Sequence, residues 1–172
     1  MFYAVLIATL TMVPVATDQP PTDADISEIE RENAELIKSQ TIEKAFVIVK
    51  STSQYKEARR VAERAARRLK LRLDLRGLVA SPKGGLTFSK AECEAGAWDF
   101  PCYVARGRND DGAYVSIEYS DAFAEFARGL YIVIVASGSR GDARIENTAK
   151  AARPAFPDLY TRITGVYMGC MH

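Results

Sequence analysis

An α+β fold with one antiparallel sheet is predicted by three features of the sequence. The first is an internal repeat, in which residues 46–59 align without a gap on residues 131–144, at an offset of 85 residues. The second is that each copy begins with a β-branched run typical of a buried strand and continues into an alanine-rich helix. The third is an apolar stretch after each helix, which can form a second strand. These features predict two βαβ units, the split βαβ or ferredoxin-like fold, with a four-stranded sheet and both helices on one side.

The first copy is predicted to contain a strand at 46–51, a helix at 55–69 and a strand at 72–79. A Ser/Gln turn separates the first strand from the helix, because such polar residues punctuate elements. One helix face is apolar at a spacing of 3.6 residues, while the opposite face is basic. The apolar positions are Ala58, Val61, Ala62, Ala65, Ala66 and Leu69.

The second copy is predicted to contain a strand at 131–136, a helix at 142–152 and a final strand at 161–169. Pro154 and Pro157 follow the helix. A proline inside a helix removes a backbone hydrogen bond and clashes with the preceding turn, so the helix is expected to end near Arg153.

An insertion of about fifty residues, at about 80–128, separates the two copies. Asp111-Gly112 stands between two β-rich runs and predicts an inserted β-hairpin. On the second run, Glu118 alternates with apolar neighbours, which is typical of a half-solvated strand. We find no acid that the sequence places opposite Glu118, as glycosidase chemistry requires.

The cysteines predict one disulfide. Cys93 and Cys102 are nine residues apart in a loop-like stretch, and closing such a loop stabilises a chain by roughly 2–3 kcal/mol. Three unrelated reduced thiols are the alternative. Cys170 is left unpaired and is expected to be a small buried hydrophobe in the final strand.

The N-terminus predicts export. Residues 2–16 form an uncharged apolar run that matches the core of a secretory signal peptide and is too short to span a bilayer. An N-terminal strand of the core is the alternative. We expect a signal peptide at 1–17, an acidic linker or short helix at 18–44 and the domain at 45–172. The protein is then periplasmic or secreted, without a stable membrane span after processing.

The acidic segment predicts a short amphipathic helix. Seven acids and one arginine lie between Asp18 and Glu35, and Thr22 or Asp23 can cap a helix there. Heptad a and d positions are taken by Ile26, Ile29, Asn33 and Leu36. Two heptads are too few to dimerise alone, so a short stalk or a docked helix is the main expectation.

Composition excludes several function classes. The only histidine is the terminal His172, so a Ser-His-Asp triad or a multi-histidine metal site is not expected. With a net charge of +1 and no base-reading motif, nucleic acid is not an expected partner. We therefore predict no catalytic residues, no metal and no cofactor. One local exception is residues 56–76, with nine basic residues against three acids, which form either a solvated face or a site for an acidic partner or anionic cell-wall polymer.

The aromatic and β-branched strand, the serine-containing turn and the alanine-rich helix together resemble the SPOR (sporulation-related repeat) domain family. The resemblance covers residues 45–78 and 130–170. Ser51 matches the serine of the family's first strand, V-Q-x-G-S-F, while Ile48 and Lys50 replace its glutamine and glycine. The resemblance implies an exported, ferredoxin-like domain that binds peptidoglycan glycan strands lacking stem peptides.

The expected function is therefore a non-catalytic cell-envelope binding module, recognising peptidoglycan or another envelope component through its sheet face. The expected contacts are strand-end turn residues and two tyrosines: Ser51, Ser53, Gln54, Tyr131, Ser137, Ser139, Arg140 and Tyr167. The turn residues are alternatively simple helix caps. A second function is an exported protein-binding factor, such as an inhibitor or immunity protein of a cell-wall hydrolase. Its contacts would be the insertion's aromatic residues Trp98, Phe100 and Tyr103.

Overall fold

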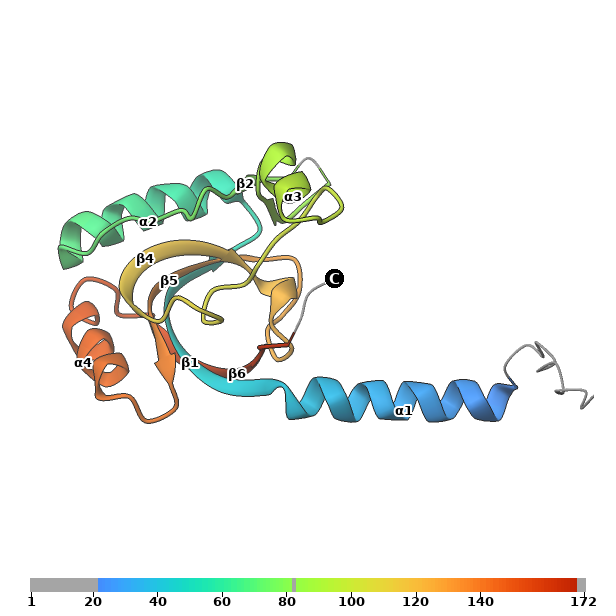
Figure 1. The fold of residues 1–172 in the computed structure, drawn as a ribbon. Coiled ribbons are helices and arrows are strands. Elements are labelled where there is room, and N and C mark those ends of the chain that lie inside the picture. Colours follow the sequence, from blue (N-terminus) through green and yellow to red (C-terminus); the bar gives the residue numbers. More distant parts are fainter. Residues whose placement is uncertain (1–21, 82, 170–172) are drawn as a thin grey trace, which may run out of the picture. The chain divides into compact units, whose positions relative to one another are not determined.

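The structure, a computed structural model, describes residues 22–81 and 83–169 (Figure 1). The predicted signal segment, Cys170 and His172 lie outside these residues. The chain divides into two compact units, Met1–Glu35 and Leu36–His172. We describe each unit by itself.

Helix α1 (Asp23–Ser39) begins at a reciprocal cap. The Thr22 amide donates to Asp25 Oδ2 (2.9 Å), and the Asp25 amide donates to Thr22 Oγ1 (3.3 Å). These contacts satisfy amides that the first helical turn leaves unpaired. The helix contains no buried residue.

The second unit is built on a four-stranded antiparallel sheet, as expected. Its strands are β1 (Thr41–Thr52), β4 (Gly112–Tyr119), β5 (Tyr131–Ser139) and β6 (Tyr160–Tyr167), in the order β4-β5-β1-β6. The long β1 pairs with β5 on one side and with β6 on the other. The α+β class is confirmed, and the arrangement is compatible with a ferredoxin-like one.

One face of the sheet, the helix-side face, packs against α2 (Tyr55–Leu69) and α4 (Ala143–Ala152). Both helices contribute to one apolar core with the sheet, so they lie on the same side of it, as predicted. Figure 1 shows both helices outside the curve of the sheet. Members of this core include Val47, Val133, Val135, Ala58, Ala62 and Ile145.

The opposite face, the loop-side face, is covered as well. A second apolar core there consists of Phe46, Ile48, Phe123, Ile132, Ile134 and Val166. Gly107 shows how closely the covering segment approaches, because a Cβ there would lie 2.9 Å from the Phe46 ring and its φ is +95°. The sheet therefore has two buried faces over β4, β5 and the middle of β1, while most of the edge strand β6 stays exposed.

The second strand of the first copy was predicted wrongly. Residues 72–79 do not join the sheet as a strand. Only Leu73 forms an isolated parallel bridge, with Val115 at the outer edge of β4. Arg76 and Gly77 both have left-handed backbone angles (φ 58° and 71°), which turn the chain away after Leu75. Strand β4, predicted as part of an insertion, completes the sheet instead.

The predicted hairpin at Asp111-Gly112 is also absent from this part of the structure. Strand β4 begins at Gly112, and the preceding residues 102–110 form no strand. The insertion instead contains the short pair β2 (Val79–Ala80) and β3 (Leu86–Thr87), then α3 (Lys90–Ala95). A 3-10 turn, η1 (Ser120–Ala122), follows β4. The segment after α3 runs inside the curve of the sheet (Figure 1).

The predicted disulfide is confirmed. Cys93 in α3 is bonded to Cys102, with their Cα atoms 5.8 Å apart. The bond fixes α3 to the start of the segment that crosses the loop-side face.

Candidate functional site

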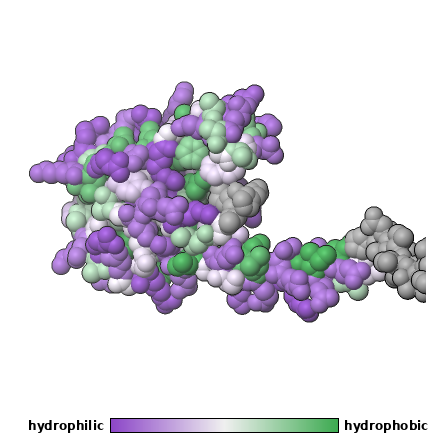
Figure 2. Space-filling view, viewed as in Figure 1, coloured by the Kyte–Doolittle hydropathy of each residue, from purple (hydrophilic) through white to green (hydrophobic). Residues whose placement is uncertain are grey.

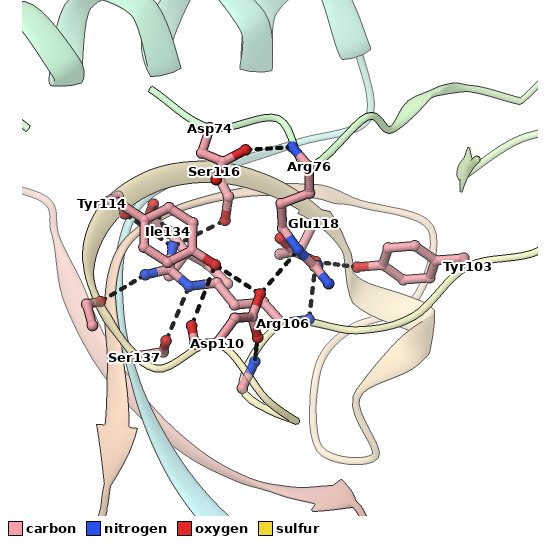
Figure 3. A network of polar contacts seen from close by, with 12 residues as sticks. Asp74, Arg76, Tyr103, Arg106, Asp110, Tyr114, Ser116, Glu118, Ile134 and Ser137 are labelled. Atoms are coloured by element: carbon pink, nitrogen blue, oxygen red, sulfur yellow. Dashed lines mark hydrogen bonds and ion pairs between the residues drawn. The ribbon is translucent and has the colours of Figure 1, made fainter. Parts of the chain in front are cut away.

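A network of polar contacts surrounds Arg106 on the loop-side face (Figure 3). Arg106 is fully buried. Its Nε donates to Ser137 Oγ (3.0 Å), and its Nη1 donates to Ser116 Oγ (3.0 Å). Further acceptors are the carbonyl oxygens of Tyr114 (2.9 Å), Gly112 (2.8 Å) and Ile134 (3.4 Å). One side chain therefore ties the covering segment to both β4 and β5.

Arg106 has no carboxylate partner in an ion pair among residues 22–81 and 83–169. Its guanidinium carbon instead lies 3.5 Å from the centroid of the Tyr114 ring. Burial lowers the pKa of Arg106, because leaving water disfavours the charged form. The same effect raises the pKa of the Tyr114 hydroxyl.

Glu118 accepts hydrogen bonds from three neighbouring groups. Its Oε2 accepts from Arg76 Nη1 (2.9 Å), the Tyr103 hydroxyl (2.5 Å) and the Arg106 amide (3.2 Å). Burial opposes the charge on Arg76, but Glu118 and Asp110 outweigh it and hold the pKa of Arg76 above its usual value. Burial and the Glu118 charge both raise the pKa of Tyr103.

This Arg106–Glu118 network has a structural role, because it holds the covering segment on the sheet. Its members are Arg76, Tyr103, Arg106, Asp110, Tyr114, Ser116, Glu118 and Ser137. Arg106 and Glu118 are both fully buried, so neither reaches solvent in this conformation. Glu118 Oε1 is the one buried side-chain oxygen or nitrogen of the described chain that lacks a hydrogen-bond partner. Such an orphan is costly, and it is tolerated here beside two arginines.

An accessible site lies on the other side of the molecule, between α2 and α4. Three cavities of about 590, 440 and 400 Å³ adjoin one another there. The first shares Arg68, Leu69 and Ala151 with the second, and Arg64 and Ala155 with the third. We call this surface the α2–α4 groove.

The groove is basic. Arg64, Arg68 and Lys70 line it, and none of them forms an ion pair within the described part of the chain. Arg64 lies over the Phe156 ring, 5.4 Å from its centroid. The first two cavities have no acidic residue in their lining, and Asp158 borders the third. Figure 2 shows hydrophilic side chains gathered over α2. Unpaired cations beside small apolar residues can hold an anionic ligand.

The sequence-predicted binding residues fall into two groups at opposite ends of the sheet. Because β1 and β5 are antiparallel, Thr52 pairs with Tyr131 while Lys44 pairs with Ser139. The first end holds Ser51, Ser53, Gln54 and Tyr131. The second end holds Ser137, Ser139 and Arg140, with Tyr167 paired to Thr41.

Members of these groups differ in accessibility. Tyr131 is buried, and its hydroxyl donates to the Gly85 carbonyl (3.2 Å). Ser137 is buried against Arg106. Arg140 is exposed and pairs with Glu43 (3.0 Å), and Gln54 is exposed at the start of α2 without a side-chain capping bond.

The aromatic residues of the insertion point in different directions. Phe100 is 47% exposed, and Val79 in the same insertion is 54% exposed. Trp98 is half-buried. Tyr103, expected at the surface, is turned inward, because its hydroxyl joins Glu118 in the buried network.

No group of three or more His, Cys, Asp or Glu side chains is placed to hold a metal ion in the part of the chain that the structure describes. Within the same residues, no helix is both long and apolar enough to cross a membrane. Comparison of the chain with protein-family models, curated proteins and solved structures finds no match.

Sequence reasoning missed the roles of Arg76 and Arg106. The one available signal was Glu118, an acid in the middle of a β-rich run without an evident partner. Its partners come from residues 42 and 15 positions away, together with the Arg106 amide, and no local pattern marks them.

Proposed function

We propose that the protein is a non-catalytic, exported module that binds an anionic component of the cell envelope in the α2–α4 groove. The observation that carries this proposal is the continuity of three cavities lined by Arg64, Arg68 and Lys70, whose charges are unpaired within the described residues. A polymer bearing phosphate groups fits best, because phosphate suits the planar fork of arginine.

The covering of β4, β5 and the middle of β1 favours the groove over that part of the sheet as the binding surface. A glycan on the loop-side face would have to displace the segment that carries Arg106 and the apolar core around Phe46. The helix-side face is occupied by α2 and α4. The groove is open between α2 and α4 and continues to the end of β1, where Lys50 and Ser51 line its third cavity, so it needs no rearrangement.

We further propose that the fold is a split βαβ in which β4 serves as the second strand of the first unit. In support, β1 and β4 are both antiparallel to β5, and α2 lies between β1 and β4 in the chain. A SPOR-like relationship remains part of this proposal and rests on the arrangement of elements alone.

Export is supported by the bond between Cys93 and Cys102, because disulfides persist mainly in oxidising compartments. The apolar N-terminal run is consistent with a signal peptide.

The test is retention of the purified protein on cell-wall sacculi that carry phosphate-rich polymers, compared with sacculi stripped of them by hydrofluoric acid. We expect binding to the first preparation only, and we expect it to weaken with added salt. Vesicles of phosphatidylglycerol form a third arm, and binding there alone would assign the anion to a lipid headgroup.

The variant Arg64→Glu/Arg68→Glu should bind about tenfold or more weakly, which corresponds to about 1.4 kcal/mol. Lys83→Glu/Arg128→Glu is the matched control, because it makes the same charge change at exposed residues outside the groove. Equal binding by the two variants, or retention on neither sacculus preparation, contradicts the proposal.

A second candidate function is an exported protein-binding factor that uses the insertion. The exposed Phe100 and Val79 favour it, since aromatic side chains commonly anchor protein interfaces. Binding to a cell-wall hydrolase that is lost in Phe100→Ala but kept in Arg64→Glu/Arg68→Glu would support this second function over the first.

A further inference from the structure

Helix α1 exposes an apolar stripe. Ile26, Ile29, Leu36 and Ile37 are between 43% and 53% exposed, and no residue of the helix is buried. Ile26, Ile29 and Leu36 occupy a and d positions of two heptads, with Asn33 at the remaining a position. Figure 2 shows hydrophobic patches on an otherwise hydrophilic helix. Such a stripe is the surface that one helix offers to another.

The positions beside the stripe are acidic. With Ile26 at a, the flanking e positions hold Asp23 and Glu30, and the flanking g positions hold Asp25 and Glu32. These four side chains would border any helix that packs on the stripe. None of the four forms an ion pair within the described residues.

This arrangement opposes pairing of α1 with a second copy of itself. In a parallel pair, Asp25 of one helix faces Glu30 of the other, because g residues meet e residues one heptad on. In an antiparallel pair, e residues meet e residues and g residues meet g residues, so acids again face acids. Like charges at these positions destabilise a coiled coil and set partner choice.

We propose that α1 is a docking helix for a basic amphipathic helix of another protein. The partner helix would cover Ile26, Ile29 and Leu36 with its own apolar residues and place Lys or Arg beside the four acids. A polar residue opposite Asn33 would fix the register, as buried polar groups do in coiled coils. This proposal rests on residues separate from those of the α2–α4 groove.

The length of α1 sets the scale of the contact. Its 17 residues span about 26 Å, or little more than two heptads. A pair this short is weak between free helices, so charge complementarity decides which partner binds. An anionic membrane surface is disfavoured as an alternative, because the acids beside the stripe would face anionic headgroups.

The test uses the full chain and two synthetic 21-residue peptides as probes, measured by fluorescence anisotropy. Both peptides carry Ile and Leu at a and d with one Asn at a central a position. One has Lys at every e and g position, and the other has Glu there. We expect the Lys peptide to bind at least about tenfold more tightly than the Glu peptide, and less tightly as salt is added.

Two charge variants locate the contact. Glu30→Lys/Glu32→Lys turns two of the four seam acids into bases and leaves Asp23 and Asp25, so the preference for the Lys peptide should be largely lost. Glu28→Lys/Glu35→Lys makes the same charge change at c positions, away from the seam, and should retain the preference. Ile29→Asn should abolish binding without affecting the fold of the second unit.

Three outcomes would overturn the proposal: equal binding of the two peptides, equal losses in both charge variants, or dimerisation of the unmodified chain that Ile29→Asn abolishes. Arg64→Glu/Arg68→Glu should leave Lys-peptide binding largely intact. Failure of this proposal is therefore distinguishable from failure of the groove.

Discussion

Over β4, β5 and the middle of β1, the two faces of the sheet are both buried, but by different means. On the helix-side face, β4 presents Val115 and Ile117 to an apolar core that α2 and α4 complete. On the loop-side face, the same strand presents Tyr114, Ser116 and Glu118 to a segment without regular structure. A strand that alternates apolar and polar residues is normally half-solvated, yet here the polar half is enclosed.

The difference shows how a loop can act as a layer of a fold. A helix satisfies its own backbone and offers an apolar stripe, so packing alone holds it. An irregular segment must satisfy its polar groups through side chains. Glu118 accepts from the Arg106 amide and Asp110 from the Gly107 amide, while the Arg106 side chain bonds β4 and β5. The loop-side face should therefore be sensitive to single polar substitutions where the helix-side face is not.

The largest expected effect is that of Arg106→Ala. The variant leaves two serine hydroxyls and at least two carbonyl oxygens without their buried donor, so the free energy of unfolding should fall by about 3–5 kcal/mol. Chemical denaturation measures this, with the exposed Arg128→Ala as the control within about 0.5 kcal/mol of the parent. A loss below about 1 kcal/mol would mean that the segment is held by its apolar contacts alone.

Removal of the disulfide should have the next largest effect. Cys93→Ser/Cys102→Ser is expected to lower the free energy of unfolding by about 2–3 kcal/mol, because the unfolded chain regains loop freedom. Amide hydrogen exchange should accelerate in residues 103–110 before it does in α2 and α4. Uniform acceleration across both faces would show that the bond does not act on the loop-side face in particular.

Alkaline pH should also act on the loop-side face first. The folded state raises the pKa of Tyr103 and Tyr114, so their contribution to stability is complete below the unfolded value near 10 and is lost as pH rises above it. We expect a loss of about 1.4 kcal/mol per pH unit for each tyrosine. Denaturation curves of Tyr114→Phe at pH 9 and 11 should differ less than those of the parent, and an unchanged difference would count against this assignment.

The smallest effect on stability is expected for a matched pair of apolar substitutions, one on each face of the sheet. Ile134→Val on the loop-side face and Ile145→Val on the helix-side face each remove one methylene from a buried residue. Both should cost about 1 kcal/mol, because the transfer and cavity contributions are alike. Thermal unfolding with calorimetry can compare them, and a loop-side loss several times larger would show that the apolar core there is less able to relax.

Much of the fold could be predicted from the sequence. Strands β1 and β5 and helices α2 and α4 follow from local periodicity, and the 85-residue offset identifies them as related pairs. The prediction of a strand at 72–79 was wrong because Leu71, Leu73 and Leu75 alternate with charged residues, as the residues of a strand would. They are partly buried against the helix-side core, but the chain turns at Arg76 and leaves the sheet edge.

The candidate site was predictable only in part. The basic face of α2 is visible in the sequence, because its arginines recur on the helical period. The groove itself depends on where α4 lies, and only the tertiary structure brings Ala151 and Ala155 beside Arg64 and Arg68. The two predicted turns could not form one site, because antiparallel pairing of β1 and β5 carries them to opposite ends.

The segment 70–111, which carries the chain from α2 to β4, is far longer than the usual connection of a βαβ unit. Closing a loop about three doublings longer than a five-residue one costs only about 2 kcal/mol of chain entropy. The crosslink between Cys93 and Cys102 stabilises the chain by a similar amount, about 2–3 kcal/mol. With the disulfide formed, the long connection therefore changes the free energy of unfolding very little. In a reducing environment the entropy cost of the connection would remain without this compensation, and the fold would be less stable.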